Sequence, residues 1–297
     1  MSAPVLFDLP GPKAMARIRI GTGVGILLVL ALLAFVLVRL NGNGQLDPAR
    51  WAILFDPNSG VPQALGEALV RTLRVAAVAM VAATVLGVLL AVGRLSDHRW
   101  VRIPVTTVIE FFRAIPLLVV IFALYFVLPA FGPDLSAFAA LGLGLTLYNM
   151  AVLAEIFRAG ILSVDKGQRE AAYALGMRKT QVMTLVLLPQ ATRRMLPVLI
   201  AQIVVLLKDT SLGFIIGYFE LLRQARSLVE FLNFNFGNIY TLQIYVGAGL
   251  LYILINVLLS QVAKLVEKRT RSSAKASGAP TPSVAAVRFD SGNNSGL

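Results

Sequence analysis

The 297-residue chain contains no cysteine and one histidine, and only 14% of its residues are charged. Without cysteine it forms no disulfide and offers no thiolate to a metal. The single imidazole, His98, supplies neither a histidine metal cluster nor a Ser-His triad. The chain also lacks a glycine-rich phosphate loop of the Walker type. These absences predict a protein that binds no metal or other cofactor, performs no covalent catalysis and is not its own ATPase.

Apolar residues, in contrast, make up 57% of the chain, well above the share in a soluble domain. They form runs long enough to cross a bilayer, which predicts an all-α integral membrane protein with six transmembrane helices. The predicted spans are 18–40, 67–93, 104–130, 138–160, 194–218 and 240–262. The first run is too long, and too poor in small residues at its end, to favour a cleavable signal peptide.

Lysine and arginine are distributed unevenly between the connections of these spans. Most of the 27 basic residues lie on one side if the N-terminus is cytoplasmic. The positive-inside rule then places both termini and the connection 161–193 in the cytoplasm of a bacterial cell, with the protein multi-pass in the plasma membrane. We interpret the formal charge of +12 as a topology signal and an attraction to membrane lipid headgroups, with no nucleic-acid partner.

The remaining segments divide the chain further. We expect a cytoplasmic N-terminal tail over 1–17, the first span over 18–40 and a permease core over 67–262. The external loop 41–66 is rich in Gly, Asn, Asp and Pro and contains an apolar patch that predicts a short interfacial helix. The end of the chain, 263–297, is predicted to be a largely disordered cytoplasmic tail.

Residues 170–189, EAAYALGMRKTQVMTLVLLP, form a soluble, helix-favouring insert between apolar runs. Ala171 and Ala172 favour helix, Gly176 permits a sharp turn between two short helices, and Pro189 can open or kink the next helix. An ordinary amphipathic linker need not show the spacing of the fixed positions, which are Glu170, Ala171, Ala172, Gly176, Val186, Leu188 and Pro189. At these positions the insert resembles the EAA motif of permease subunits of binding-protein-dependent ABC importers, with Val186 where isoleucine is commoner.

Further segments resemble the polar amino acid branch of these permeases. Their sequence is most similar to that of subunits for glutamate or related amino acids. They are FFRAIPLLVVIFALYF (111–126), GLTLYNMAVLAEIFRAGILSVDKGQREAA (144–172) and LLKDTSLGFIIGYFEL (206–221). The resemblance covers about residues 65–262. It implies the five-helix core of a type I ABC importer, here preceded by an extra span, with Glu170, Ala171, Ala172, Gly176, Leu188 and Pro189 coupling to an ATPase.

The resemblance also implies partners. They are a separate ATP-binding subunit that uses ATP and Mg, a second permease subunit that is identical or paralogous, and an extracellular or periplasmic amino acid binding protein. The sequence does not decide between a copy and a paralogue, nor which amino acid is carried.

Polar residues inside the predicted spans are candidates for a substrate path, because a charge or amide in the bilayer needs a partner or water. They are Tyr148, Asn149, Lys208, Asp209, Thr210 and Ser211. Two roles are open for them: lining the path, where the ammonium of Lys208 would attract a carboxylate, or holding helices together by hydrogen bonds. Neighbours on a helix point in different directions, so Lys208 and Asp209 are not expected to pair with each other.

Glu110, Arg113 and Pro116 are candidates for a gate or hinge at the inner end of the third span. Pro116 predicts a kink, which would serve either a hinge or helix packing. Glu110 and Arg113, like Glu155 and Arg158, are spaced i and i+3 and are expected to pair along a helix.

Two other classes of protein remain alternatives. A gradient-driven secondary amino acid transporter would use Lys208 and Asp209 for ion coupling, but such proteins show internal repeats, and none is evident here. A membrane scaffold or sensor would leave the polar residues without a pathway.

Overall fold

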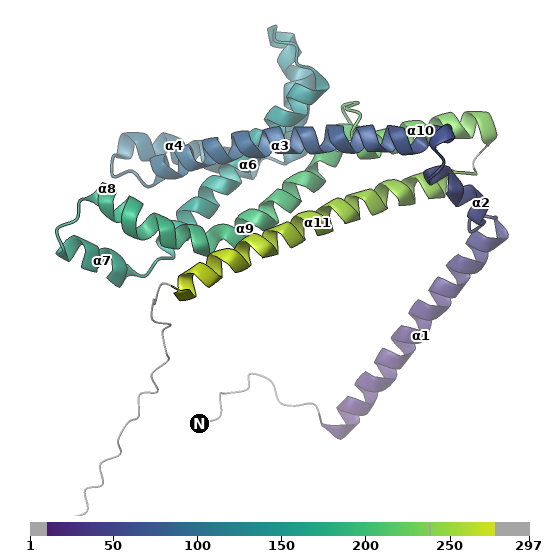
Figure 1. Ribbon diagram of the computed structural model, residues 1–297, viewed down its shortest axis with the longest axis horizontal. Coiled ribbons are helices and arrows are strands. Elements are labelled where there is room, and N and C mark those ends of the chain that lie inside the picture. The colour runs from purple at the N-terminus through teal and green to yellow at the C-terminus, as the bar shows by residue number, and fades with distance from the viewer. Residues whose placement is uncertain (1–10, 238, 277–297) are drawn as a thin grey trace, which may run out of the picture. The chain divides into compact units, whose positions relative to one another are not determined.

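The computed structural model describes residues 11–237 and 239–276. Every regular element in these ranges is helical, as predicted. The α-helices are α1 (Pro12–Gly42), α2 (Pro48–Trp51), α3 (Val61–Arg94), α4 (Arg99–Ala114), α5 (Leu117–Phe122), α6 (Ala137–Leu162), α7 (Lys166–Ala174), α8 (Lys179–Gln181), α9 (Leu188–Asp209), α10 (Leu221–Phe236) and α11 (Thr241–Ala276) (Figure 1). Shorter 3-10 turns occupy Ala52–Leu54, Pro57–Ser59, Leu128–Phe131 and Thr210–Phe214, and π turns occupy Ala123–Val127 and Val182–Leu187.

Within the part of the chain that the structure describes, five helical segments are long and apolar enough to cross a membrane, and a sixth is reached if one bent pair counts as a single span. The five are Pro12–Gly42, Val61–Arg94, Ala137–Leu162, Lys179–Phe214 and Thr241–Val262. The predicted number of spans is therefore confirmed on that count.

The third predicted span, 104–130, is not a straight helix. It consists of α4 and the segment Leu117–Phe131, which meet at 99°. The break falls at Ile115 and Pro116, where both residues have extended backbone conformations. Proline disfavours the helical conformation of the residue before it and lacks the N–H that a helix interior needs. The predicted kink at Pro116 is present, but it is large enough to end one helix and begin another.

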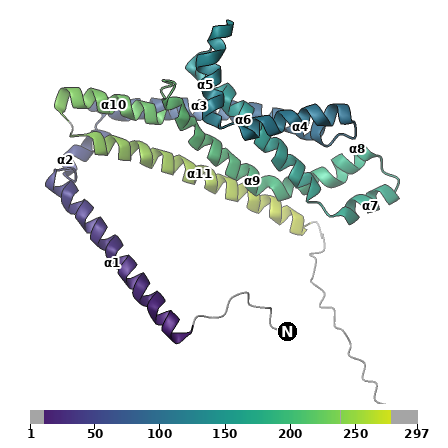
Figure 2. The ribbon, with the colours of Figure 1, turned by 180° about the vertical axis from the view of Figure 1, so that it is seen from behind.

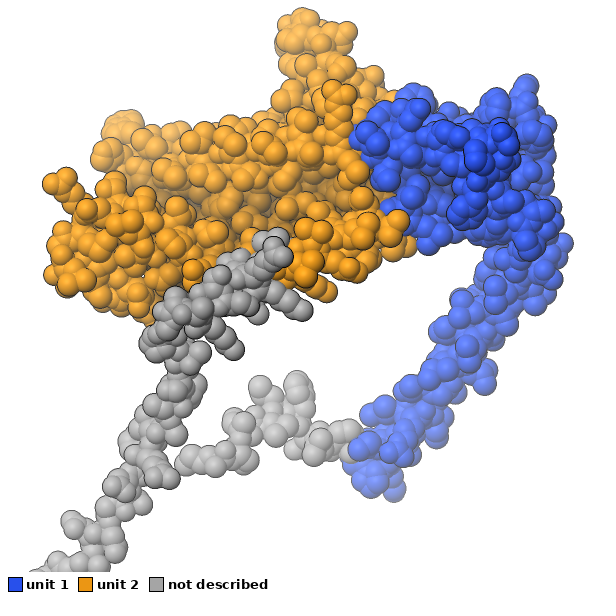
Figure 3. All heavy atoms as spheres, viewed as in Figure 1, with its two compact units in different colours: residues 1–71, 219–251 blue, residues 72–218, 252–297 orange. Residues whose placement is uncertain are grey.

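The chain divides into two compact units, coloured separately in Figure 3. The first consists of residues 1–71 and 219–251. In this unit Gln243, which is fully buried on α11, donates a hydrogen bond of 2.9 Å to the carbonyl of Gln45. Trp51 Nε1 donates to the same carbonyl at 2.9 Å, which fixes the short helix α2 expected in the external loop. α1 contributes no buried residue.

The second unit, residues 72–218 and 252–297, contains the transmembrane core. Its buried side chains form two apolar clusters, one around Phe157 and Met195 and one around Leu141 and Leu206. α6 is the central helix and packs extensively against α9. Figures 1 and 2 both show α9 beside the last part of α11.

Some predicted boundaries fall inside helices. α3 begins at Val61, within the expected external loop 41–66, and α11 continues to Ala276, within the expected tail 263–297. Residues 1–10 and 277–297 of the two predicted tails lie outside the described residues.

Candidate coupling insert and transport path

The connection between α6 and α9, residues 163–187, is called the coupling insert below. Its first helix, α7, is capped by Asp165, whose carboxylate accepts a hydrogen bond of 2.7 Å from Gly167 N. α7 ends at Ala174, and Gly176 follows the cap residue Leu175 with a φ of +75°. Gly176 N donates to Tyr173 O at 2.9 Å, and Met177 N donates to Ala172 O at 3.2 Å. These two bonds form a Schellman motif, which confirms the predicted glycine turn between two short helices.

One face of the insert packs onto the core. Ala172, Val182 and Leu187 are at most 6% exposed and belong to the apolar cluster around Phe157. The other face presents the rest of the motif to its surroundings: Glu170, Ala171 and Gly176 are exposed.

Large apolar side chains near the turn are also exposed. Leu175 is 83% exposed, Leu185 68% and Tyr173 45%. The insert thus has one face packed on the core and one exposed face of small and apolar side chains. In the motif itself Ala172 is buried, whereas its neighbour Ala171 is exposed.

Pro189 lies at the beginning of α9, directly after the π turn Val182–Leu187. Proline has no N–H to donate to the residue four positions earlier, and its ring displaces that carbonyl. A π turn absorbs this mismatch without ending the helix. Pro189 therefore marks a bulge in one continuous helical segment, Lys179–Phe214, which joins the insert to the core.

The insert is tied to the connection between α3 and α4. Lys179, on α8, forms an ion pair with Asp97. This hydrogen bond and charge hold the pKa of the Asp97 carboxyl below its usual value. Arg194, on α9, donates to the carbonyl of Ser163 at the end of α6.

Charged side chains from three helices, α3, α4 and α6, form a network. Arg94, at the end of α3, contacts Glu110 on α4 at 2.9 Å and Glu155 on α6 at 2.8 Å. The predicted pairs along each helix are present as well, because Arg113 lies 3.6 Å from Glu110 and Arg158 Nε lies 2.9 Å from Glu155. The sequence analysis recognised the two local pairs and missed Arg94, whose side chain is only 16% exposed and bridges them.

The candidate path residues on α6 are held inside the protein. Asn149 is fully buried: its amide nitrogen donates to Leu145 O at 2.8 Å, and its oxygen accepts from Gln202 on α9 at 2.8 Å. Tyr148 next to it is half-buried. The amide of Asn149 thus finds the partners that an apolar environment requires, and Gln202 is a polar residue of the bundle that the sequence analysis did not single out.

The candidates on α9 lie where this helix tightens into a 3-10 turn. Lys208 is exposed, Asp209 and Ser211 are half-buried, and Thr210 is fully buried and donates to Leu207 O at 2.7 Å. Lys208 and Asp209 form no ion pair among the residues that the structure describes. The expected absence of a pair between these neighbours thus holds within that part of the chain.

Comparison with known proteins agrees with this architecture. Residues 83–272 match the family described as the binding-protein-dependent transport system inner membrane component. The chain is 40% identical over 239 residues to the glutamate transport system permease protein GluD of Corynebacterium glutamicum, covering 78% of this chain and 84% of the relative. It is 38% identical over 176 residues to the probable glutamine ABC transporter permease protein GlnP of Bacillus subtilis, covering 58% and 79%.

A solved structure has the same fold. The crystal structure of an amino acid ABC transporter with histidines superimposes with a TM-score of 0.65 at 31% identity, covering 70% of this chain and 94% of that one. As its description says, a membrane component of this family serves a transport system that depends on a binding protein. The chain belongs to this family of inner membrane components and is a multi-pass permease subunit of the polar amino acid branch of ABC importers.

Proposed function

We propose that this permease carries glutamate or a related polar amino acid into the cell, driven by a separate ATP-binding subunit that docks on the coupling insert. The observation that supports docking is the two-faced insert: Ala172, Val182 and Leu187 are anchored in the core while Leu175 and Gly176 are exposed. The glutamate assignment follows from the relative GluD, and the glutamine relative places it within a class of similar substrates.

In this proposal the insert and both termini face the cytoplasm, and two permeases, identical or paralogous, each dock one ATPase. ATP and Mg are used by the partner, and this chain supplies no catalytic group. A binding protein delivers the amino acid to the outer side. Closure of the two ATPase subunits draws the two inserts together, and the continuous segment Lys179–Phe214 conveys this movement into the core.

The polar residues in the core offer a route for the substrate. Lys208, exposed on α9, presents an ammonium that would attract a substrate carboxylate, and Asp209, Thr210 and Ser211 follow it. The break at Pro116, with Glu110 and Arg113 before it, is the proposed hinge that changes access to this route.

The experiment is copurification of the chain with its partners from the native host, followed by uptake in vesicles. We expect an ATPase subunit to copurify with the wild type and to be lost with Gly176→Trp, while the amount of permease in the membrane stays the same. Gly176→Asn is the matched control because asparagine tolerates a positive φ.

Uptake separates the two transport classes. An ATP-driven importer continues to take up its substrate after the proton and sodium gradients are collapsed. Uptake by the chain alone in vesicles without ATP would overturn the proposal in favour of a secondary transporter. Competition of labelled glutamate uptake by unlabelled polar amino acids then identifies the substrate.

A further inference from the structure

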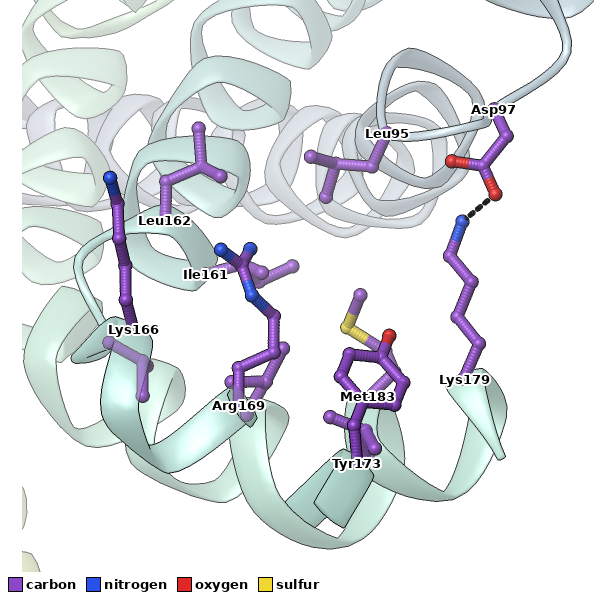
Figure 4. A pocket seen from close by; sticks show the side chains of 12 residues that line it. Leu95, Asp97, Ile161, Leu162, Lys166, Arg169, Tyr173, Lys179 and Met183 are labelled. Carbon is purple, nitrogen blue, oxygen red and sulfur yellow. Dashed lines mark hydrogen bonds and ion pairs between the residues drawn. The ribbon is translucent and has the colours of Figure 1, made fainter. Parts of the chain in front are cut away.

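A cavity of about 360 Å3 lies between the coupling insert and the connection of α3 to α4 (Figure 4). Its apolar wall includes Leu95, which directly follows α3, and Ile161 and Leu162, the last residues of α6. Its basic residues, Lys166, Arg169 and Lys179, come from the insert. The cavity therefore lies at the level where membrane-spanning helices end and combines an apolar wall with a cationic rim.

The charges of this rim are not balanced within the cavity. Asp97 is the one acidic residue among those that line it, and it is paired with Lys179. Lys166 and Arg169 form no ion pair among the described residues of the chain. The neighbouring Asp165 does not line the cavity and forms no ion pair among the described residues; its carboxylate accepts a hydrogen bond of 2.7 Å from Gly167 N.

The two basic residues are arranged to act together. Lys166 and Arg169 are spaced i and i+3 on α7, so they lie on one face of this helix. Figure 4 shows both side chains extending from α7 toward the end of α6, where Ile161 and Leu162 lie. An ammonium and a guanidinium on one helix face beside an apolar wall match a phosphate group that carries an acyl chain.

We propose that this cavity binds the phosphate of an anionic phospholipid, with the lipid headgroup between Lys166 and Arg169 and the first part of its chains against Leu95 and Leu162. A bound lipid would connect the insert to the helix ends above it. The position of the insert, and so its coupling to a partner, would then depend on the headgroup composition of the membrane.

The test uses the complete transporter, purified with its partner subunits and exchanged into either phosphatidylglycerol or phosphatidylcholine. Lipids that remain bound are counted by native mass spectrometry, and ATPase activity stimulated by the loaded binding protein is measured in both lipids. We expect the wild type to retain phosphatidylglycerol selectively and to be more active in it.

The decisive variant is Lys166→Gln combined with Arg169→Gln. Each basic residue near a membrane surface contributes about 1 kcal/mol, so removing both predicts roughly 30-fold weaker retention of phosphatidylglycerol. Arg99→Gln combined with Arg102→Gln removes two exposed charges that do not line the cavity and should retain lipid as the wild type does. Lys166→Arg combined with Arg169→Lys keeps both charges and should also retain it.

Equal retention of phosphatidylglycerol by the Lys166→Gln, Arg169→Gln variant and the wild type would overturn the proposal, and mass spectrometry shows directly whether the variant complex is intact. Inorganic phosphate added to the lipid-stripped complex distinguishes a free ion from a lipid. If phosphate occupies the site and phosphatidylglycerol does not compete with it, the ligand is a free anion and the lipid assignment is wrong.

Discussion

The coupling insert and the middle of the transmembrane core use polar and apolar residues in opposite ways. In the insert, Leu175 and Leu185 are exposed and the backbone turns sharply at Gly176. In the core, Asn149 is fully buried and its hydrogen bonds are made inside the bundle, with Leu145 O on its own helix and with Gln202 on α9. The exposed apolar groups of the insert form the surface on which we propose that a partner docks, whereas buried polar groups with partners inside the bundle hold the helices in place.

The largest loss of uptake is expected when a charge is placed on the exposed tip of the insert, at Leu175. Leu175→Glu removes little packing, because Leu175 is 83% exposed, so stability should change by less than about 0.5 kcal/mol. A carboxylate in a docking surface costs several kcal/mol, so uptake should fall by at least about tenfold. Uptake and thermal unfolding are measured in parallel, with Leu175→Met as the apolar control. Full uptake by Leu175→Glu would show that the tip contacts no partner.

The ion network lies between the two regions, and Arg94 joins its halves. Arg94→Met leaves Glu110 and Glu155 without the cation between them, and we expect a loss of about 2 kcal/mol in stability, read as a lower thermal midpoint. Arg94→Lys should be intermediate, because an ammonium lacks the fork that reaches two carboxylates. Adding Glu155→Gln to Arg94→Met should restore part of the loss; no recovery would argue against a direct coupling of these side chains.

Substitution of Asn149 tests whether its hydrogen bond with Gln202 serves only to hold two helices together. Asn149→Ala leaves the amide of Gln202 without this partner, and we expect a loss of about 1 kcal/mol, similar to that of Gln202→Ala and not doubled when both are changed. A packing role changes the thermal midpoint and leaves the substrate concentration for half-maximal uptake unaltered. A large change in that concentration at unchanged stability would place Asn149 on the path.

The smallest effect concerns the ion pair of Asp97 and Lys179 on the edge of the insert. Because the pKa of Asp97 is lowered from 3.8, the contact is complete above that value and is lost only as the pH falls through the lowered pKa. The difference in thermal midpoint between the wild type and Asp97→Asn should therefore be constant over about pH 5 to 8. A difference that varies within this interval would mean that another group controls the contact.

The insert could be predicted from the sequence because its geometry is local. The turn at Gly176 is determined by residues within five positions, and its bonds connect Ala172 to Met177 and Tyr173 to Gly176. Most of the local structure of the insert could therefore be predicted from the spacing of the motif residues.

The contacts of the core were harder to predict from the sequence because they join residues that are far apart in the chain. Arg94 meets a carboxylate 61 positions away, at Glu155, and Asn149 meets Gln202, 53 positions away. The contact of Arg94 could have been predicted, because Arg94 lies at the predicted inner end of one span and Glu110 and Glu155 lie at the predicted inner ends of two others. The size of the bend at Pro116 depends on how α5 packs on α6, which the local sequence does not contain.

The helical segment Lys179–Phe214 runs without interruption for 36 residues, from the edge of the insert to the polar turn after Lys208. At about 1.5 Å per residue it is a rod of roughly 54 Å. A rod of this kind acts as a lever: a tilt imposed at Lys179 swings the opposite end, and the π turn before Pro189 is the compliant joint near the applied force. In the proposed coupling, the stiffness of this segment sets how much of a small displacement at its insert end arrives at the far end.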